Sequence, residues 1–204
     1  MTPPAHRLLR AATILASLAA ALTLPAAPAG AAVQLVCPNA TAQPFLPWVD
    51  SASYYFAPNG GFERGTTGWT LTGGARVVAG SEPFAVHAAG DAYALSLPAG
   101  SSATTGPMCI GALSTKMRFF ARNSGASTSR LAVKVIYDGG LGQVLGIADA
   151  GTIAAGKWQP SPAITMLGGV LPLLTQDVRV RFVPADATGA WSIDDVYVDP
   201  LMHR

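Results

Sequence analysis

The chain has 204 residues, of which only 12% are charged, with 13 basic and 11 acidic side chains. This balance gives no electrostatic reason to expect binding to nucleic acid or to an anionic membrane surface. With 22 glycines and 16 prolines, the composition favours short strands joined by turns over long exposed helices.

The first 32 residues have the features of a secretory signal peptide. His6, Arg7 and Arg10 precede an apolar run, Ala11–Leu24, and small residues follow up to Ala32. The apolar run is shorter than the ~20 residues that a membrane-spanning helix needs. We therefore expect residues 1–32 to be removed and the protein to be secreted and extracellular, without insertion in a membrane. Their removal leaves 11 basic and 11 acidic residues, and thus no net charge.

Two cysteines remain, Cys37 and Cys109. An even number in an exported chain predicts one disulfide. The loop that it closes holds about 70 residues, for which the chain-entropy model gives a stabilisation of about 4 kcal/mol. A zinc site or a catalytic thiol is the alternative, but after residue 32 the chain offers only His87 and His203 as histidine partners.

Residues 33–52 form a proline-punctuated N-terminal lead, which we expect to lie extended on the domain surface, held by Cys37. From residue 53 to residue 200, short apolar runs with period-two alternation predict strands. They are Ser53–Ala57, Trp69–Val78 with a break at Gly73–Gly74, Phe84–His87, Ala92–Leu97, Pro107–Gly111, Lys116–Arg122, Leu131–Tyr137, Val178–Phe182 and Trp191–Val198. No helical pattern separates them, so the fold class is all-β, a two-sheet antiparallel β-sandwich of the jelly-roll kind. Residues 201–204 are a short C-terminal tail.

The last predicted strand has a defect in its alternation. Trp191 and Ile193 point to one face, whereas Val196 and Val198 fall on the other if the pleat is regular. A β-bulge at Asp194–Asp195 returns both apolar pairs to the core and turns one aspartate inward. A buried carboxylate needs a hydrogen-bond partner or a cation.

The stretch Asn59–Trp69, NGGFERGTTGW, contains four glycines and the acid Glu63. If the first and last strands lie near each other, Glu63 and Asp195 can approach. Two carboxylates with backbone carbonyls suit Ca²⁺, which takes six to eight oxygen ligands. The alternative is that Glu63 pairs with Arg64, Arg76 or a backbone N–H.

Three motifs together resemble the galactose-binding-like jelly rolls, which include many carbohydrate-binding modules. They are the opening stretch Asn59–Trp69, the Gly156–Trp158 turn and the closing WSIDDVYV of Trp191–Val198. The resemblance spans about Ser53 to Pro200. It implies a structural calcium ion held by Glu63 and Asp195, with backbone oxygen near Asn59 as a third ligand.

The resemblance also implies a sugar-binding role, in which aromatic rings stack on pyranose faces and polar side chains hydrogen-bond the hydroxyls. Candidate ligand-binding residues are Tyr93, Arg118 and Arg122, while Trp158 is either a core or a ligand residue. Trp69 and Trp191 are predicted to be core, because each lies in the apolar phase of its strand.

We expect a non-catalytic domain that binds a glycan or a cell-surface polymer. The alternative is a structural or adhesive extracellular protein with no sugar site. A small hydrolase is a third class, since Asp91 lies four residues after His87, but the sequence has no G-x-S-x-G motif.

Overall fold

The structure is a computed structural model that describes residues 37, 41–111, 115–138, 144–166 and 176–199. The predicted signal peptide, residues 1–32, and the tail, residues 201–204, lie outside this part. One 3-10 turn, η1 (Leu46–Trp48), precedes the strands. The strands are β1 (Tyr55–Phe56), β2 (Trp69–Thr72), β3 (Arg76–Ala79), β4 (Tyr93–Pro98), β5 (Ser102–Thr105), β6 (Met108–Ile110), β7 (Thr115–Asn123), β8 (Leu131–Asp138), β9 (Val144–Ile153), β10 (Gln159–Pro160), β11 (Ile164–Met166), β12 (Gln176–Pro184) and β13 (Ala190–Asp199).

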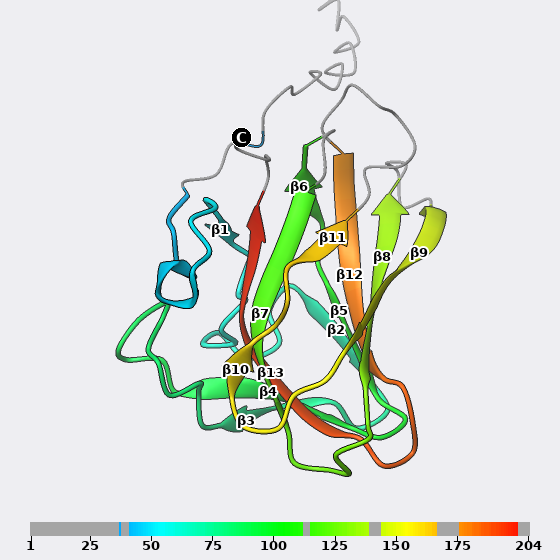
Figure 1. Cartoon of the computed structure of the whole chain (residues 1–204). Coiled ribbons are helices and arrows are strands. Elements are labelled where there is room, and N and C mark those ends of the chain that lie inside the picture. Colours follow the sequence, from blue (N-terminus) through cyan, green and yellow to red (C-terminus); the bar gives the residue numbers. More distant parts are fainter. Residues whose placement is uncertain (1–36, 38–40, 112–114, 139–143, 167–175, 200–204) are drawn as a thin grey trace, which may run out of the picture. The chain divides into compact units, whose positions relative to one another are not determined.

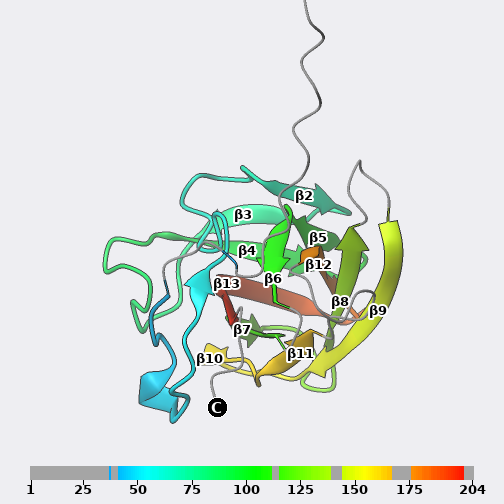
Figure 2. The same cartoon turned by 90° about the horizontal axis from the view of Figure 1, so that it is seen from above.

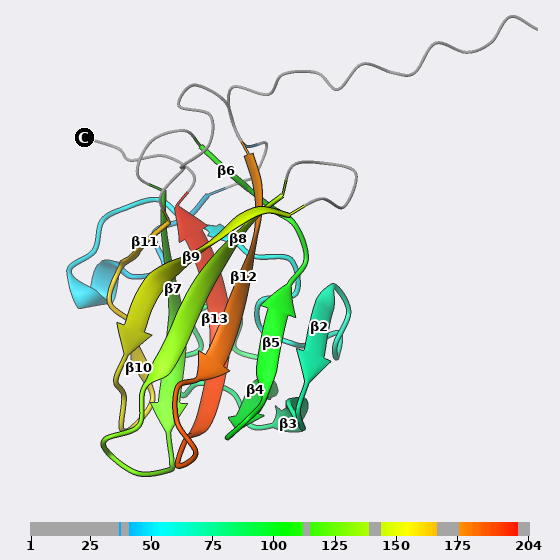
Figure 3. The same cartoon turned by 90° about the vertical axis from the view of Figure 1, so that its right-hand side faces the viewer.

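The strands form two antiparallel sheets, as predicted (Figures 1 and 3). The first sheet has the order β10-β7-β13-β4-β3, with β1 also paired to β13 and β11 to β7. The second sheet has the order β2-β5-β12-β8-β9, with β6 also paired to β12. Viewed from above, β13 runs between β4 and β7 (Figure 2). In the part of the chain that is described, no helix is long and apolar enough to cross a membrane.

The core lies between the sheets. Phe119 of β7 meets Phe182 of β12 edge-on, with ring centroids 5.0 Å apart. The alternation that predicted the strands accounts for this contact, since every second side chain of a strand points to the same face. In the core are Met117, Phe119 and Ala121 from the first sheet and Val178, Val180 and Phe182 from the second. Trp69 and Trp191 also belong to the core, as predicted.

One predicted strand is wrong: Phe84–His87 lies in the connection between β3 and β4 and forms no strand. The carboxylate of Glu82 accepts hydrogen bonds from the backbone N–H groups of Phe84 and Val86. Ala85 between them has a φ of 53°, in the left-handed region. A side chain that turns back onto its own backbone competes with sheet formation, and here it forms a tight turn.

Strands β5, β9, β10 and β11 were not predicted. In β9, three small residues face the core: Gly146, Ala148 and Ala150. Two large apolar residues, Leu145 and Ile147, face outward. The alternation of polar and apolar residues is therefore lost, although the strand pairs with β8 along its length. The predicted break at Gly73–Gly74 is confirmed as the turn between β2 and β3.

The N-terminal lead is fixed to both sheets. Cys37 forms the predicted disulfide with Cys109 of β6. Phe45 is fully buried on the outer face of the first sheet, where it stacks on Phe120 with centroids 5.6 Å apart. Ala42 pairs with Tyr54 in an isolated antiparallel bridge. We call the buried residues Phe45, Tyr54, Phe120 and Tyr197 the outer aromatic cluster.

Candidate functional site

The glycine-rich stretch is a compact turn built around Asn59. The Asn59 amide nitrogen donates to the carbonyls of Gly65 (2.9 Å) and Thr67 (3.0 Å). Its side-chain oxygen accepts the N–H of Arg64 at 3.0 Å. The Asn59 carbonyl accepts from the Trp69 indole at 3.2 Å. The buried side chain of Asn59 therefore closes the turn, and its backbone carbonyl connects the turn to Trp69 at the start of β2.

The predicted bulge in β13 is confirmed. The register of β13 against β7 shifts between Asp194 and Tyr197. Asp195 has a φ of 46°, in the left-handed region. Both apolar pairs, Trp191 with Ile193 and Val196 with Val198, are in the core. The bulge carries two buried aspartates, Asp194 (0% exposed) and Asp195 (1% exposed), where the sequence predicted only one inward carboxylate.

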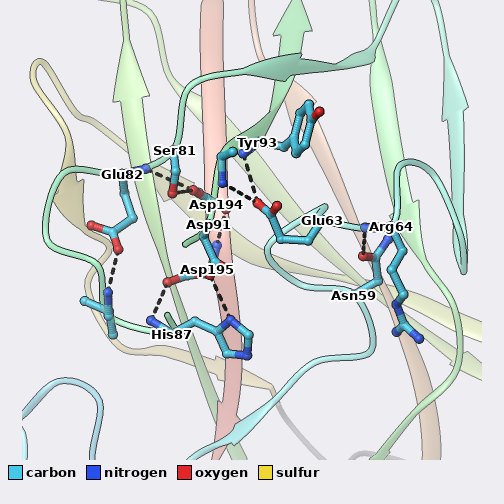
Figure 4. A network of polar contacts seen from close by, with 12 residues as sticks. Asn59, Glu63, Arg64, Ser81, Glu82, His87, Asp91, Tyr93, Asp194 and Asp195 are labelled. Atoms are coloured by element: carbon cyan, nitrogen blue, oxygen red, sulfur yellow. Dashed lines mark hydrogen bonds and ion pairs between the residues drawn. The ribbon is translucent and has the colours of Figure 1, made fainter. Parts of the chain in front are cut away.

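The connection between β3 and β4 supplies donors to these aspartates (Figure 4). Asp194 Oδ2 accepts from the Ser81 hydroxyl (2.8 Å) and the Glu82 N–H (3.0 Å). Asp195 Oδ2 accepts from the His87 N–H at 3.0 Å. Asp195 Oδ1 has no hydrogen-bond partner, and it is a buried atom. Both carboxylate oxygens of Asp194 therefore have hydrogen-bond partners, as expected for a buried carboxylate, whereas only one oxygen of Asp195 has a partner.

Burial perturbs both carboxyl groups. It raises the pKa of Asp194 from its ordinary value of 3.8 to about 8, against the hydrogen bond from the Glu82 N–H, which favours the charged form. Burial first, and then the nearby negative charges of Glu82 and Asp91, raise the pKa of Asp195 to about 7, against the hydrogen bond from the His87 N–H. The bulge is therefore a place where negative charge is costly unless a cation is present.

A histidine and a second aspartate lie beside Asp195. His87 Nδ1 is 2.8 Å from Asp91 Oδ2, and one ligand atom from each of His87, Asp91 and Asp195 lies within 4.8 Å of the others. The His87 ring stacks on Phe56, with centroids 3.8 Å apart and 9° between the planes. His87 and Phe56 also line a cavity of about 430 Å³, together with Ala57, Pro58, Asn59, Gly61, Glu63 and Arg64.

Two of the three predicted calcium ligands, Glu63 and Asn59, use oxygen atoms for hydrogen bonds in this arrangement. Glu63 Oε1 accepts the backbone N–H groups of Ala92 (2.8 Å) and Tyr93 (2.9 Å), which is the alternative that the sequence left open. The two oxygens of Asn59 accept hydrogen bonds within the turn. The calcium site stays a prediction. Sequence reasoning missed His87 and Asp91 as neighbours of Asp195; their spacing of four residues was visible, but their approach to a residue more than 100 positions away was not.

The candidate ligand residues lie in three different environments. Tyr93 is 43% exposed and lies on the side of β4 that carries Leu95 and Leu97, next to the carboxylates (Figure 4). Arg118 is buried beneath the N-terminal lead, where it donates to Asp50 (2.8 Å) and to the Ser161 carbonyl (2.9 Å). These contacts give Arg118 a structural role. Arg122 is exposed on the outer face of the first sheet.

Arg122 belongs to a row of polar side chains that crosses the first sheet. Strand register places Arg76 opposite Ser96, Ser96 opposite Ser192, and Ser192 opposite Arg122. Residues directly opposite in a sheet share a face. The Arg122 guanidinium lies 5.2 Å from the centroid of the Trp158 ring, which is half-buried and packs against the outer aromatic cluster. We call these four residues with Trp158 the polar row.

No protein-family model matches the sequence, and no curated protein matches it. Among solved structures, the chain is similar to the CBM22-1–GH10 modules of Clostridium thermocellum xylanase 10B complexed with xylohexaose (16% identity, 74% of this chain, 29% of that chain, TM-score 0.49). It is similar to the carbohydrate-binding module TmCBM61 in complex with β-1,4-galactotriose (19% identity, 72% of this chain, 98% of that chain, TM-score 0.45). It is also similar to the enzymatically active domain of bacteriophage CBA120 tailspike protein 4 (17% identity, 71% of this chain, 21% of that chain, TM-score 0.50).

The chain thus spans less than a third of the xylanase fragment and of the tailspike domain. The likeness to the tailspike domain, at 17% identity, concerns the fold alone.

Proposed function

We propose that the chain is a secreted, non-catalytic β-sandwich domain that binds a carbohydrate or a cell-surface polymer through the polar row of its first sheet. The observation that carries the proposal is the position of Trp158 beside Arg122, at one end of a row in which Arg76 and Arg122 are exposed, Ser96 is half-buried and Ser192 is buried.

This arrangement supplies the two kinds of contact that a sugar requires. The ring of Trp158 offers a flat apolar surface to the C–H groups of a pyranose. Its packing against the outer aromatic cluster fixes the ring, so that little conformational freedom is lost on binding. Arg76 and Arg122 offer donors to hydroxyl oxygens, and the half-buried Ser96 can donate or accept.

The outer face of the second sheet is a weaker candidate. It carries a comparable line of polar side chains in register, Thr70, Thr104, Arg181, Lys134 and Asp149. Its exposed apolar side chains are aliphatic, Leu145 and Ile147. No exposed aromatic ring belongs to that face within the described ranges. The first sheet therefore offers the better stacking surface.

Two further features support a secreted role. The Cys37–Cys109 disulfide suits an oxidising compartment, and the N-terminal 32 residues have the pattern of a signal peptide. The non-catalytic part of the proposal rests on the sequence, which lacks a G-x-S-x-G nucleophile motif.

The proposal is tested with a glycan array that includes xylohexaose and β-1,4-galactotriose, followed by calorimetric titration of each hit. We expect binding to be weakened by Arg122→Gln and by Ser96→Gln, which places a bulky side chain in the row without removing a core contact. The matched control is Thr70→Gln, an exposed position of the second sheet. An absence of binding across the array indicates the alternative, a structural or adhesive domain without a sugar site.

A further inference from the structure

The carboxylate of Asp195 has an oxygen that nothing in the described structure satisfies. Oδ2 accepts the His87 N–H, but Oδ1 is buried without a hydrogen-bond partner, on a residue that is 1% exposed. An ionised carboxylate oxygen in that position costs free energy unless it meets a donor or a cation. The unpaired Oδ1 of Asp195 indicates that a ligand binds here, and its burial distinguishes the site from an ordinary group of surface acids.

The space in front of this oxygen is kept open by Gly61. A Cβ atom at Gly61 would lie 3.0 Å from Asp195 Oδ1 and 3.7 Å from Asp91 Oδ2. The two carboxylate oxygens therefore border the same small space, and any other residue at position 61 would fill it. Gly61 also lines the cavity of about 430 Å³, so this space adjoins a route to solvent.

The third group at this space is the imidazole of His87. Two atoms bound at ~2.1 Å to one tetrahedral ion lie ~3.4 Å apart, and two atoms on opposite sides of any such ion lie at most ~4.2 Å apart. His87 Nδ1 and Asp91 Oδ2 are 2.8 Å apart, a hydrogen-bond distance that must widen by about half an ångström when both atoms bind one ion. All three ligand atoms lie within 4.8 Å of one another, so an approach of up to about 1.4 Å, within reach of side-chain rotation, brings them to the spacing of a tetrahedral site. The stacking of His87 on Phe56 holds the ring in place.

We propose that His87, Asp91 and Asp195 bind one divalent transition-metal ion of the zinc class, with solvent from the adjoining cavity completing the coordination. Two carboxylates and one neutral imidazole balance the charge of such an ion. The nitrogen ligand separates this site from the calcium site that the sequence motifs imply, because Ca²⁺ takes oxygen ligands and Zn²⁺ readily takes imidazole. Glu63 and Asn59 use oxygen atoms for backbone hydrogen bonds and are not members of the set.

The experiment titrates the purified, untagged and chelator-treated protein with ZnCl₂ and, separately, with CaCl₂, by calorimetry and by thermal unfolding. His6 and His203 lie outside the described residues, so the titrations are made in a background with both changed to Gln. We expect Zn²⁺ to bind at one ion per chain and to raise the melting temperature, and Ca²⁺ to do neither at the same concentration.

Three variants locate the site. His87→Gln and Asp91→Asn are expected to weaken Zn²⁺ binding by at least about tenfold. Glu63→Gln, which changes a predicted calcium ligand only, is expected to leave it unchanged. Co²⁺ added in place of Zn²⁺ gives an absorption spectrum that reports imidazole coordination directly and is lost in His87→Gln. Binding of Ca²⁺ with no effect of Zn²⁺ overturns the proposal, as does Zn²⁺ binding that His87→Gln and Asp91→Asn leave intact.

Discussion

Gly60 lies so close to Val196 that a Cβ atom at position 60 would be 2.8 Å from the Val196 carbonyl oxygen. The Gly60 carbonyl also accepts the Val196 N–H at 3.2 Å. The opening glycine-rich turn thus docks directly on the backbone that follows the bulge of β13, near the two ends of the sandwich domain. We expect Gly60→Ala to lower the free energy of unfolding by about 2 kcal/mol, because backbone atoms must move to admit the methyl group.

The matched control for this change is Gly90→Ala. Gly90 is exposed, and no atom lies within 4 Å of a Cβ built there. Its substitution is expected to change the free energy of unfolding by less than about 0.5 kcal/mol. Urea denaturation of both variants measures the difference, and equal stabilities would mean that the turn does not dock on β13 as described.

Arg118 and Arg122 lie on the same face of β7 but are expected to respond in opposite ways. Arg118→Gln removes hydrogen bonds to Asp50 and Ser161 beneath the N-terminal lead, and should cost about 2 kcal/mol of stability. Arg122→Gln removes an exposed guanidinium, and should leave stability nearly unchanged while weakening glycan binding. Denaturation curves and glycan titrations of the pair measure both effects. If Arg118→Gln lost more glycan binding than its fraction of unfolded protein accounts for, Arg118 would have a direct role in binding, and the structural role described here would be contradicted.

The disulfide joins Cys37 and Cys109, which are 72 positions apart in the sequence. Replacement of both cysteines by serine is expected to lower the free energy of unfolding by about 4 kcal/mol, mainly because the unfolded chain gains freedom. The measurement is urea denaturation with and without a reductant. Reductant should reproduce the loss in the native chain and leave the double variant unaffected; a native chain indifferent to reductant would show that the bond contributes little.

The two buried aspartates predict a pH dependence of the chelator-treated protein. Their pKa values in the folded state, about 8 for Asp194 and about 7 for Asp195, exceed the ordinary 3.8, so the folded chain holds protons that the unfolded chain has released. The free energy of unfolding should therefore fall as the pH rises from about 4 to 8 and level off above that window. Denaturation across this range measures the slope, and Asp194→Asn should flatten it. If the free energy of unfolding rose between pH 4 and 8 instead, the two aspartates could not be buried in their protonated form.

The sequence was sufficient for the sandwich and for its most unusual strand. Val196 and Val198 fall out of phase with Trp191 and Ile193, and only a bulge returns all four to the core, as the structure confirms. Alternation of this kind is a local signal, so it can be read without knowing the partners of a strand. It failed in β9, where small residues face the core and apolar ones face solvent.

The carboxylate cluster could be predicted only in part. The inward turn of an aspartate followed from the bulge, but the donors that meet it come from the connection between β3 and β4. That connection contains Phe84–His87, whose apolar residues favoured a strand. The turn depends on Glu82, an acid that accepts the N–H groups of Phe84 and Val86, and no hydrophobic pattern reports such a contact. The position of His87 beside Asp195 is set by this turn.

The N-terminal lead is bonded covalently to β6 of the second sheet and packs through Phe45 and Asp50 on the outer face of the first. A tensile force applied to the chain before Cys37 is therefore transmitted through the disulfide to the second sheet. The lead cannot be peeled away residue by residue while the disulfide is intact, because the load reaches β6 and its partner β12 first. Under reducing conditions the same force would act on the lead alone, so the redox state of one bond decides whether the domain resists extension as a single mechanical unit.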